Sequence, residues 1–247
     1  MRMQVAVCAM LAAGAMYGQS VAPAPETVSA KEIAGMQAKL QDWPNLSRYK
    51  AANAMLSPST LGDGRVVFYG DSITDAWVAN GGKFFPTKPY VNRGISGQTT
   101  PQMVVRFRQD VINLHPAAVV ILAGTNDIAG NTGPETQEEI QDNFKSMIDL
   151  AKANGIRVII ASVLPAVDYP WRPGLHPALK IQALNNWLAG YCVNHTVTYL
   201  DYYSAMADDN GGMKPGISLD GVHPNAAGYA IMEPLAQAAI DRAIGRR

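Results

Sequence analysis

Short runs of apolar residues recur along the chain from residue 66 to residue 200, and helical periodicity fills most of the intervals between them. Runs of this kind, rich in Val and Ile, are typical of strands buried on both faces of a sheet. Strands that alternate with helices favour a parallel sheet covered by helices on both faces. The predicted strands are 66–69, 90–91, 117–122, 158–161 and 197–200, and the predicted helices are 103–114, 134–151, 177–191 and 226–240.

The N-terminus has a different pattern, which is that of a targeting segment. One positive charge at Arg2 precedes an apolar run from Val5 to Met16. Small residues that a signal peptidase would accept follow at Gly18, Ser20 and Ala22. This arrangement predicts a signal peptide over about residues 1–20 and export to the periplasm or beyond. The alternative is a disordered apolar tail. No apolar run reaches the roughly 20 residues of a membrane span, so we expect no stable membrane insertion.

Residues 21–60 are interpreted as a linker followed by a helical extension. Ser29 and Glu32 have the spacing of a capping box, which marks the start of a helix. A second helical piece is expected around residues 46–56. We expect both pieces to pack on the main domain, residues 61–247. The apolar face of the first helix comprises Ile33, Met36, Leu40 and Trp43.

Composition narrows the class of protein. The chain has 247 residues, of which 48% are hydrophobic, which is enough for a single domain with a full core. Twenty basic and twenty acidic residues give a formal net charge of zero. This balance argues against a nucleic-acid-binding protein, which would carry a basic excess. Cys192 would be the only cysteine left after removal of a segment containing Cys8, so we expect it to be a packing residue without a disulfide.

Candidate chemistry appears in the loops that follow the predicted strands, where open α/β sheets bind their ligands. Ser72 follows the first strand, although serine also caps helices and fills turns. Gly94 and Gly97 follow the second strand; they would let the backbone aim an N–H at a ligand, or merely position the next helix. Asn126 follows the third strand and offers a neutral amide donor, or an Asx-turn.

Asp220 and His223 lie three residues apart, just before the last predicted helix. In a loop, this spacing lets the carboxylate fold back onto the imidazole Nδ1–H, which leaves Nε2 free to face a serine. A single histidine in an Asp-rich loop is more often structural, but four such stretches, each after a strand or before a helix, would rarely occur together by chance.

Together the four stretches resemble the SGNH hydrolases, also called the GDSL esterase and lipase family. The resemblance covers about residues 65–240, with Ile73 in place of the usual leucine of the first motif. It implies a three-layer α/β/α sandwich with a flavodoxin-like parallel sheet, and ester hydrolysis without a cofactor. The stretches are Gly70-Asp71-Ser72-Ile73, Gly94-Ile95-Ser96-Gly97, Gly124-Thr125-Asn126-Asp127 and Asp220 with His223.

The resemblance also implies the role of each residue. Ser72 would be the nucleophile, His223 the general base and Asp220 the residue that orients it. The Ser72 N–H, the Gly97 N–H and the Asn126 side chain would form the oxyanion hole. The four histidines and two cysteines do not have metal-ligand spacing, so no metal is expected.

Two other classes of protein share some of these features. A flavodoxin-like cofactor-binding protein would have the same sheet but no use for Asp220 and His223 beside Ser72. A non-catalytic carbohydrate-binding protein is the second alternative. Both remain open at this point.

The loop at residues 166–175 bears on the substrate. Tyr169 and Trp171 offer flat faces and Arg172 a donor fork, which suit a sugar ring better than a long acyl chain. The alternative is that both aromatic rings plug the core beneath the loop. We therefore expect a carboxylic ester hydrolase acting on short-chain esters, of which acetyl esters carried on a carbohydrate are favoured. A lysophospholipase or general carboxylesterase is the alternative. The oligomeric state is left open.

Overall fold

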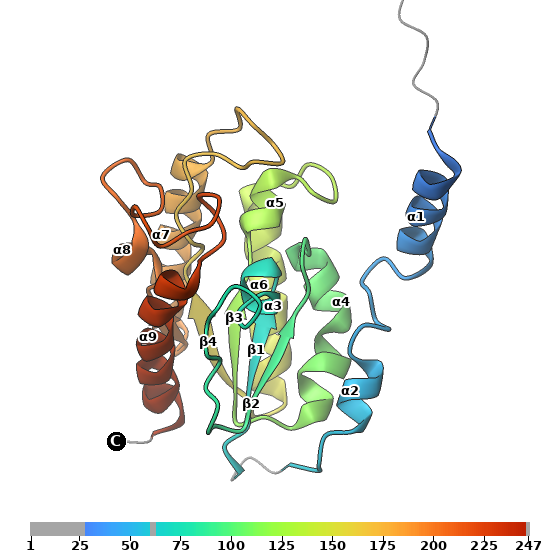
Figure 1. The fold of residues 1–247 in the computed structure, drawn as a ribbon. Helices are drawn as coiled ribbons and strands as arrows, with labels where there is room; N and C mark the ends of the chain where they lie inside the picture. Colours follow the sequence, from blue (N-terminus) through green and yellow to red (C-terminus); the bar gives the residue numbers. More distant parts are fainter. Residues whose placement is uncertain (1–27, 60–62, 246–247) are drawn as a thin grey trace, which may run out of the picture. The chain divides into compact units, whose positions relative to one another are not determined.

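The computed structural model describes residues 28–59 and 63–245 and contains a five-stranded sheet (Figure 1). Its strand order is β2-β1-β3-β4-β5 and every pairing is parallel. This is the flavodoxin-like order, and the predicted parallel sheet is confirmed. The strands are β1 (Val66–Gly70), β2 (Tyr90–Gly94), β3 (Ala118–Leu122), β4 (Arg157–Ala161) and β5 (Thr198–Leu200).

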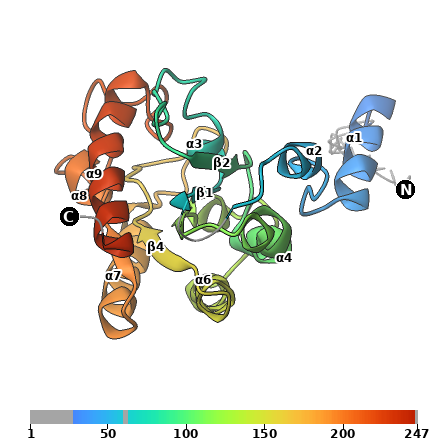
Figure 2. The same ribbon diagram turned by 90° about the horizontal axis from the view of Figure 1, so that it is seen from below.

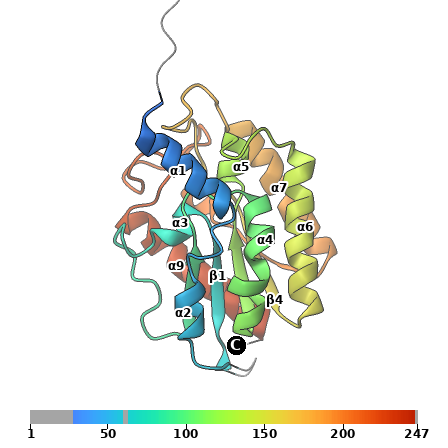
Figure 3. The ribbon, with the colours of Figure 1, turned by 90° about the vertical axis from the view of Figure 1, so that its right-hand side faces the viewer.

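Helices cover both faces of the sheet, which gives three layers. Val67 and Tyr69 of β1 belong to a core shared with α4 (Thr100–Asp110), α6 (Gln137–Ala153) and α7 (Ala178–Asn194). Their neighbours Val66 and Phe68 point the other way, into a core shared with α3 (Ser72–Asp75) and α9 (Ala226–Ile244). Because successive side chains alternate across a strand, one apolar run supplies both cores. Figure 2 shows α4 and α6 on one side of the sheet and α3 and α9 on the other, and Figure 3 shows α4 and α6 side by side.

Each predicted helix of the main domain differs from the observed one by a few residues; the helix expected over 177–191, for example, spans Ala178–Asn194. The helix expected from Pro134 begins at Gln137, because Thr136 caps it and Glu139 completes a capping box. The helix expected over 103–114 begins at Thr100 and ends at Asp110, and a 3₁₀ turn (Ile112–Leu114) follows it. The last helix continues through Pro234 to Ile244.

The N-terminal region is described in part. The predicted signal peptide and residues 21–27 lie outside the described residues. The helix α1 (Ala30–Gln41) starts with the expected capping box, in which Ser29 and Glu32 exchange hydrogen bonds. Its packing on the main domain stays a prediction. The second helical piece is shorter than expected, since α2 spans only Lys50–Ala54. Within the described ranges, no helix is both long and apolar enough to cross a bilayer.

The carboxyl ends of the parallel strands meet at one edge of the sheet. The residues that follow β1 form α3, those that follow β3 form α5 (Thr125–Ala129), and α8 (Tyr203–Met206) comes soon after β5. The predicted site residues all lie at this edge or in the loop before α9.

Candidate active site

Ser72 is placed at the end of β1 by a tight turn. A Cβ on Gly70 would lie 2.6 Å from the carbonyl oxygen of Leu122 and would also collide with Thr74, so only glycine fits there. The Asp71 side chain accepts a hydrogen bond from the N–H of Ile73 (3.0 Å) and caps α3. Ser72 is therefore the first residue of this short helix, and its side chain is only half-buried.

Ser72, His223 and Asp220 form a continuous hydrogen-bonded series. Ser72 Oγ lies 2.9 Å from His223 Nε2, and His223 Nδ1 lies 2.8 Å from Asp220 Oδ2. The other carboxylate oxygen of Asp220 accepts the backbone N–H groups of Val222 (3.0 Å) and His223 (2.8 Å). Partial burial acts to raise the pKa of Asp220, but the hydrogen bonds from His223 outweigh it and the pKa is lowered. Asp220 is thus held as an anion against the imidazole.

Asn126 lies between the loop of Ser72 and the loop of Gly97. Its side-chain nitrogen donates to the carbonyl oxygen of Gln98 (3.0 Å) and, over a longer distance, to Asp71 Oδ2 (3.4 Å). Its side-chain oxygen accepts from Asn131 Nδ2 (2.7 Å). The amide NH₂ end therefore faces the two loops from which the other expected oxyanion donors come.

Gly97 is exposed and has a φ of +80°, a left-handed conformation that favours glycine. A Cβ there would meet no atom within 4 Å, so the conformation rather than crowding selects glycine. Residues 94–98, which contain the candidate oxyanion donor Gly97 and are called the oxyanion loop below, run from the end of β2 to Gln98.

Two buried carboxyl groups, those of Asp71 and Asp127, lie next to candidate site residues in the chain. Asp71 is fully buried, and burial raises its pKa to about 7. Asp127 Oδ1 accepts the N–H of Thr100 (2.8 Å) at the start of α4, and burial raises the pKa of Asp127 as well. Neither burial was predicted, although Asp71 and Asp127 adjoin the candidate site residues Ser72 and Asn126 in the sequence.

In the loop at residues 166–175, Tyr169 is not available to a ligand, contrary to the expectation, whereas Trp171 lies beside His223. Tyr169 is 0% exposed, so it offers no flat face to a ligand; its ring is stacked beneath Trp171 at a centroid distance of 5.0 Å. Trp171 is 37% exposed, and its ring centroid lies 5.9 Å from that of His223. Arg172 is exposed and donates to the carbonyl oxygen of Gly130 (3.2 Å). Tyr169 therefore follows the core-packing alternative, whereas Trp171 borders the site.

Two further residues belong to the site's surroundings and were not predicted. Asn131 bridges Asn126 and the indole N–H of Trp171, which donates to Asn131 Oδ1 (3.1 Å). Gln98 lies directly behind Gly97 and is 3% exposed. Among the residues described, no three His, Cys, Asp or Glu side chains are grouped so that they could hold a metal ion.

The part of the chain that contains the sheet and the candidate active site is similar to known proteins. Residues 68–231 match the model of the GDSL-like Lipase/Acylhydrolase family. A solved GDSL-like lipase from Bacteroides thetaiotaomicron is 46% identical, with a TM-score of 0.78, over 81% of this chain and 98% of that one. Esterase TesA of Pseudomonas aeruginosa is 25% identical over 186 residues, 74% of this chain and 85% of the esterase. The uncharacterized lipoprotein YqeF of Bacillus subtilis is 31% identical over 81 residues; this match spans 32% of this chain and about a third of the lipoprotein's length.

Proposed function

Because the chain belongs to the GDSL-like lipase/acylhydrolase family, we propose that it hydrolyses carboxylic esters through Ser72, His223 and Asp220. The observation that carries the proposal is the series of two hydrogen bonds, 2.9 Å and 2.8 Å long, from Ser72 Oγ through the imidazole to the carboxylate. Neither a cofactor-binding protein nor a non-catalytic carbohydrate-binding protein needs this arrangement.

The proposed reaction has two steps. Ser72 Oγ attacks the ester carbonyl carbon while His223 Nε2 takes the hydroxyl proton, and the imidazolium then protonates the leaving alcohol. Water, deprotonated by the same imidazole, next attacks the acyl-serine carbonyl carbon; the imidazolium then returns that proton to Ser72 Oγ as the bond to the acyl group breaks and the carboxylic acid leaves. The Ser72 N–H, the Gly97 N–H and the Asn126 side chain would stabilise the oxyanion in both steps.

The proposed substrate is a short-chain, and specifically an acetyl, ester carried on a carbohydrate. His223 protonates the leaving alcohol, so the groups beside it face the alcohol part of the substrate. Trp171 is the aromatic ring there, and its stacking on buried Tyr169 holds it rigid. A rigid, half-open indole suits the face of a sugar ring. The apolar segment near the N-terminus supports an exported enzyme that meets such material outside the cytoplasm.

The triad is tested by kinetics on nitrophenyl acetate. Ser72→Ala and His223→Ala should each remove nearly all turnover, and the double variant should lose little more, because the two residues act as one unit. Losses that multiply in the double variant would contradict the assignment. Absence of hydrolysis by the wild-type protein, with sugar binding retained in Ser72→Ala, would instead favour the non-catalytic alternative.

The substrate is tested separately. We expect kcat/KM on nitrophenyl esters to fall as the acyl chain is lengthened from acetyl, and acetylated oligosaccharides to release acetate. Trp171→Ala should raise KM for the oligosaccharide more than for nitrophenyl acetate. A preference that rises with chain length, without acetate release, would favour a lysophospholipase or general carboxylesterase and leave the serine mechanism in place.

A further inference from the structure

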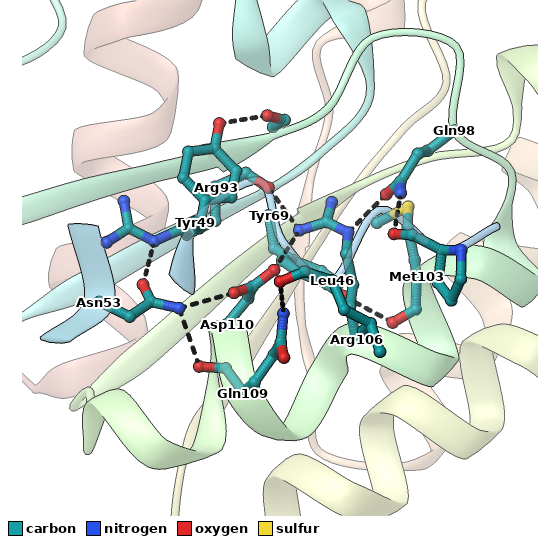
Figure 4. A network of polar contacts seen from close by, with 12 residues as sticks. Leu46, Tyr49, Asn53, Tyr69, Arg93, Gln98, Met103, Arg106, Gln109 and Asp110 are labelled. Atoms are coloured by element: carbon teal, nitrogen blue, oxygen red, sulfur yellow. Dashed lines mark hydrogen bonds and ion pairs between the residues drawn. The ribbon is translucent and has the colours of Figure 1, made fainter. Parts of the chain in front are cut away.

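A segment that precedes the family match is bonded to the oxyanion loop. Residues 43–53, called the brace below, run alongside β2 and α4 and include the first residues of α2. Figure 4 shows the polar network that joins them to the domain. The family model begins only at residue 68, so the brace lies outside it.

The brace contacts the oxyanion loop at both of its ends. The hydroxyl group of Tyr49 donates to the carbonyl oxygen of Gly94, and Tyr49 is buried. Gln98 Nε2 donates to the carbonyl oxygen of Pro44 (2.6 Å). A loop whose first and last residues are both bonded to one segment has little freedom to move away from it.

Arg106 connects the same loop to the nucleophile. This side chain is 0% exposed; its Nε donates to Gln98 Oε1 and its two terminal nitrogens to the carbonyl oxygens of Arg93 (2.9 Å) and Gly70 (3.0 Å). Gly70 immediately precedes Asp71 and Ser72. The positive charge of Arg106 is balanced by buried Asp110, at a distance of 3.2 Å. The Asp110 carboxylate also accepts a hydrogen bond from Asn53 of the brace (2.7 Å).

Gln98 stands between the brace and the oxyanion hole. Its side chain is held by Pro44 and Arg106, while its backbone carbonyl accepts the Asn126 amide at 3.0 Å. Gly97, the preceding residue, is exposed, and a Cβ on it would meet no atom within 4 Å. Gly97 is therefore held through both of its chain neighbours: through Gln98 on one side and, on the other, through Ser96, whose N–H (3.1 Å) and hydroxyl group (2.7 Å) donate to Asp75 Oδ2.

We propose that the brace is a positioning element of the oxyanion hole, and that Tyr49 and Gln98 are the positioning residues through which it acts. The proposal rests on the proposed esterase function. It assigns a catalytic purpose to a part of the chain that lies outside the family domain.

The test compares three variants with wild type. Tyr49→Phe removes one bond between the brace and the loop. Gln98→Met removes the other, together with the acceptor of Arg106 Nε, with little change in volume. Gln109→Met is the matched control, because the hydrogen bond from Gln109 Nε2 to the brace, at the carbonyl oxygen of Leu46 (2.7 Å), does not involve the oxyanion loop. Each variant is measured for kcat and KM on nitrophenyl acetate, for inhibition by a boronic acid, and for thermal stability.

We expect kcat to fall about 10- to 100-fold in Tyr49→Phe and Gln98→Met, with KM nearly unchanged, because a small misplacement of catalytic groups costs rate. Affinity for the boronic acid, which forms a tetrahedral adduct on serine, should fall in parallel, as expected for lost transition-state binding. Gln109→Met should change stability only.

Unchanged kcat and boronic acid affinity in Tyr49→Phe would overturn the proposal and leave the brace a purely structural element. Tyr49→Phe decides the question alone if Gln98→Met does not fold. Equal kcat losses in Gln109→Met would also count against it, since they would indicate a general effect of loosening. Failure of the esterase function is a different result, namely wild-type protein without Ser72-dependent hydrolysis.

Discussion

An asparagine amide can be turned either way, and only one orientation of Asn126 presents donors to an oxyanion. Asn131 fixes that orientation, because its NH₂ group donates to Asn126 Oδ1 at 2.7 Å and so keeps the oxygen away from the reaction centre. The oxygen of Asn131 meanwhile accepts the indole N–H of Trp171 at 3.1 Å. The Asn131 side chain thus connects Trp171 to Asn126, the proposed oxyanion donor.

Substitution of Asn131 by aspartate should harm catalysis more than substitution by alanine. A carboxylate at position 131 has no donor for Asn126 Oδ1 and attracts the NH₂ end instead, which reverses the Asn126 amide. We expect kcat to fall about 100-fold in Asn131→Asp, approaching the loss of the donor itself, and about 10-fold in Asn131→Ala. Asn154→Asp, at the end of α6, is the control for the same chemical change. Equal losses in the two Asn131 variants would contradict an orienting role.

At the scale of elements, the start of α9 determines where His223 lies. Asn225 caps this helix by accepting the N–H groups of Ala227 (2.9 Å) and Gly228 (3.2 Å), and its NH₂ group donates to the carbonyl oxygen of Gly216 (2.9 Å). His223 is two residues before the cap. The start of α9 and the loop that holds His223, the proposed general base, are therefore joined by the hydrogen bonds of Asn225.

Asn225→Ala should lower both stability and activity, whereas loss of the N-cap of a helix far from His223 should lower stability alone. Loss of an N-cap costs about 0.5–2 kcal/mol of unfolding free energy. The matched variant is Thr136→Ala, which removes the cap of α6, a helix without catalytic residues. Urea unfolding and kcat on nitrophenyl acetate, measured on the same preparations, would separate the two effects. An unchanged kcat in Asn225→Ala would show that the cap does not hold the general base.

The elements also show which features a sequence can predict. The strands were located because apolar runs buried on both faces are continuous, and the four motifs because each follows a strand or precedes a helix. The start of α6 was misplaced, since Pro134 suggested a beginning that Thr136 and Glu139 provide instead. Neither the brace nor Asn131 could be predicted, because their roles depend on contacts between distant positions, such as Asn53 with Asp110. The burial of Tyr169 depends likewise on the direction in which a loop folds.

At the scale of the whole molecule, the free energy of unfolding should depend on the ionisation of Glu135. Partial burial, together with the charge of Asp127, raises the pKa of Glu135 to about 7 from an ordinary 4.5. Between pH 4.5 and 7 the unfolded chain therefore loses a proton that the folded chain retains. Stability falls as the pH rises through this window and stays lower above it.

Glu135→Gln should remove that dependence, because glutamine keeps a donor and has no proton to lose. Relative to wild type, the variant should gain about 1 kcal/mol between pH 4.5 and 7, a figure reduced for solvent screening of a partly exposed group. This corresponds to ~2–4 °C in Tm, which thermal unfolding across that range would measure. Glu139→Gln is the contrast: hydrogen bonds from Thr136 lower the pKa of Glu139, so its effect belongs below pH 4.5. A constant difference between Glu135→Gln and wild type at every pH would contradict the assignment.

The separation of Ser72 and His223 along the chain, 151 positions, has a consequence for biosynthesis. A ribosome synthesises Ser72 before Asn126, and Asn126 before His223, the proposed general base. A nascent or truncated chain that stops before residue 223 carries a serine without its proton acceptor. If Ser72 and His223 act as proposed, we expect such a chain to be inactive, and we expect the first turnover of a refolding molecule to report that the loop before α9 has docked beside Ser72.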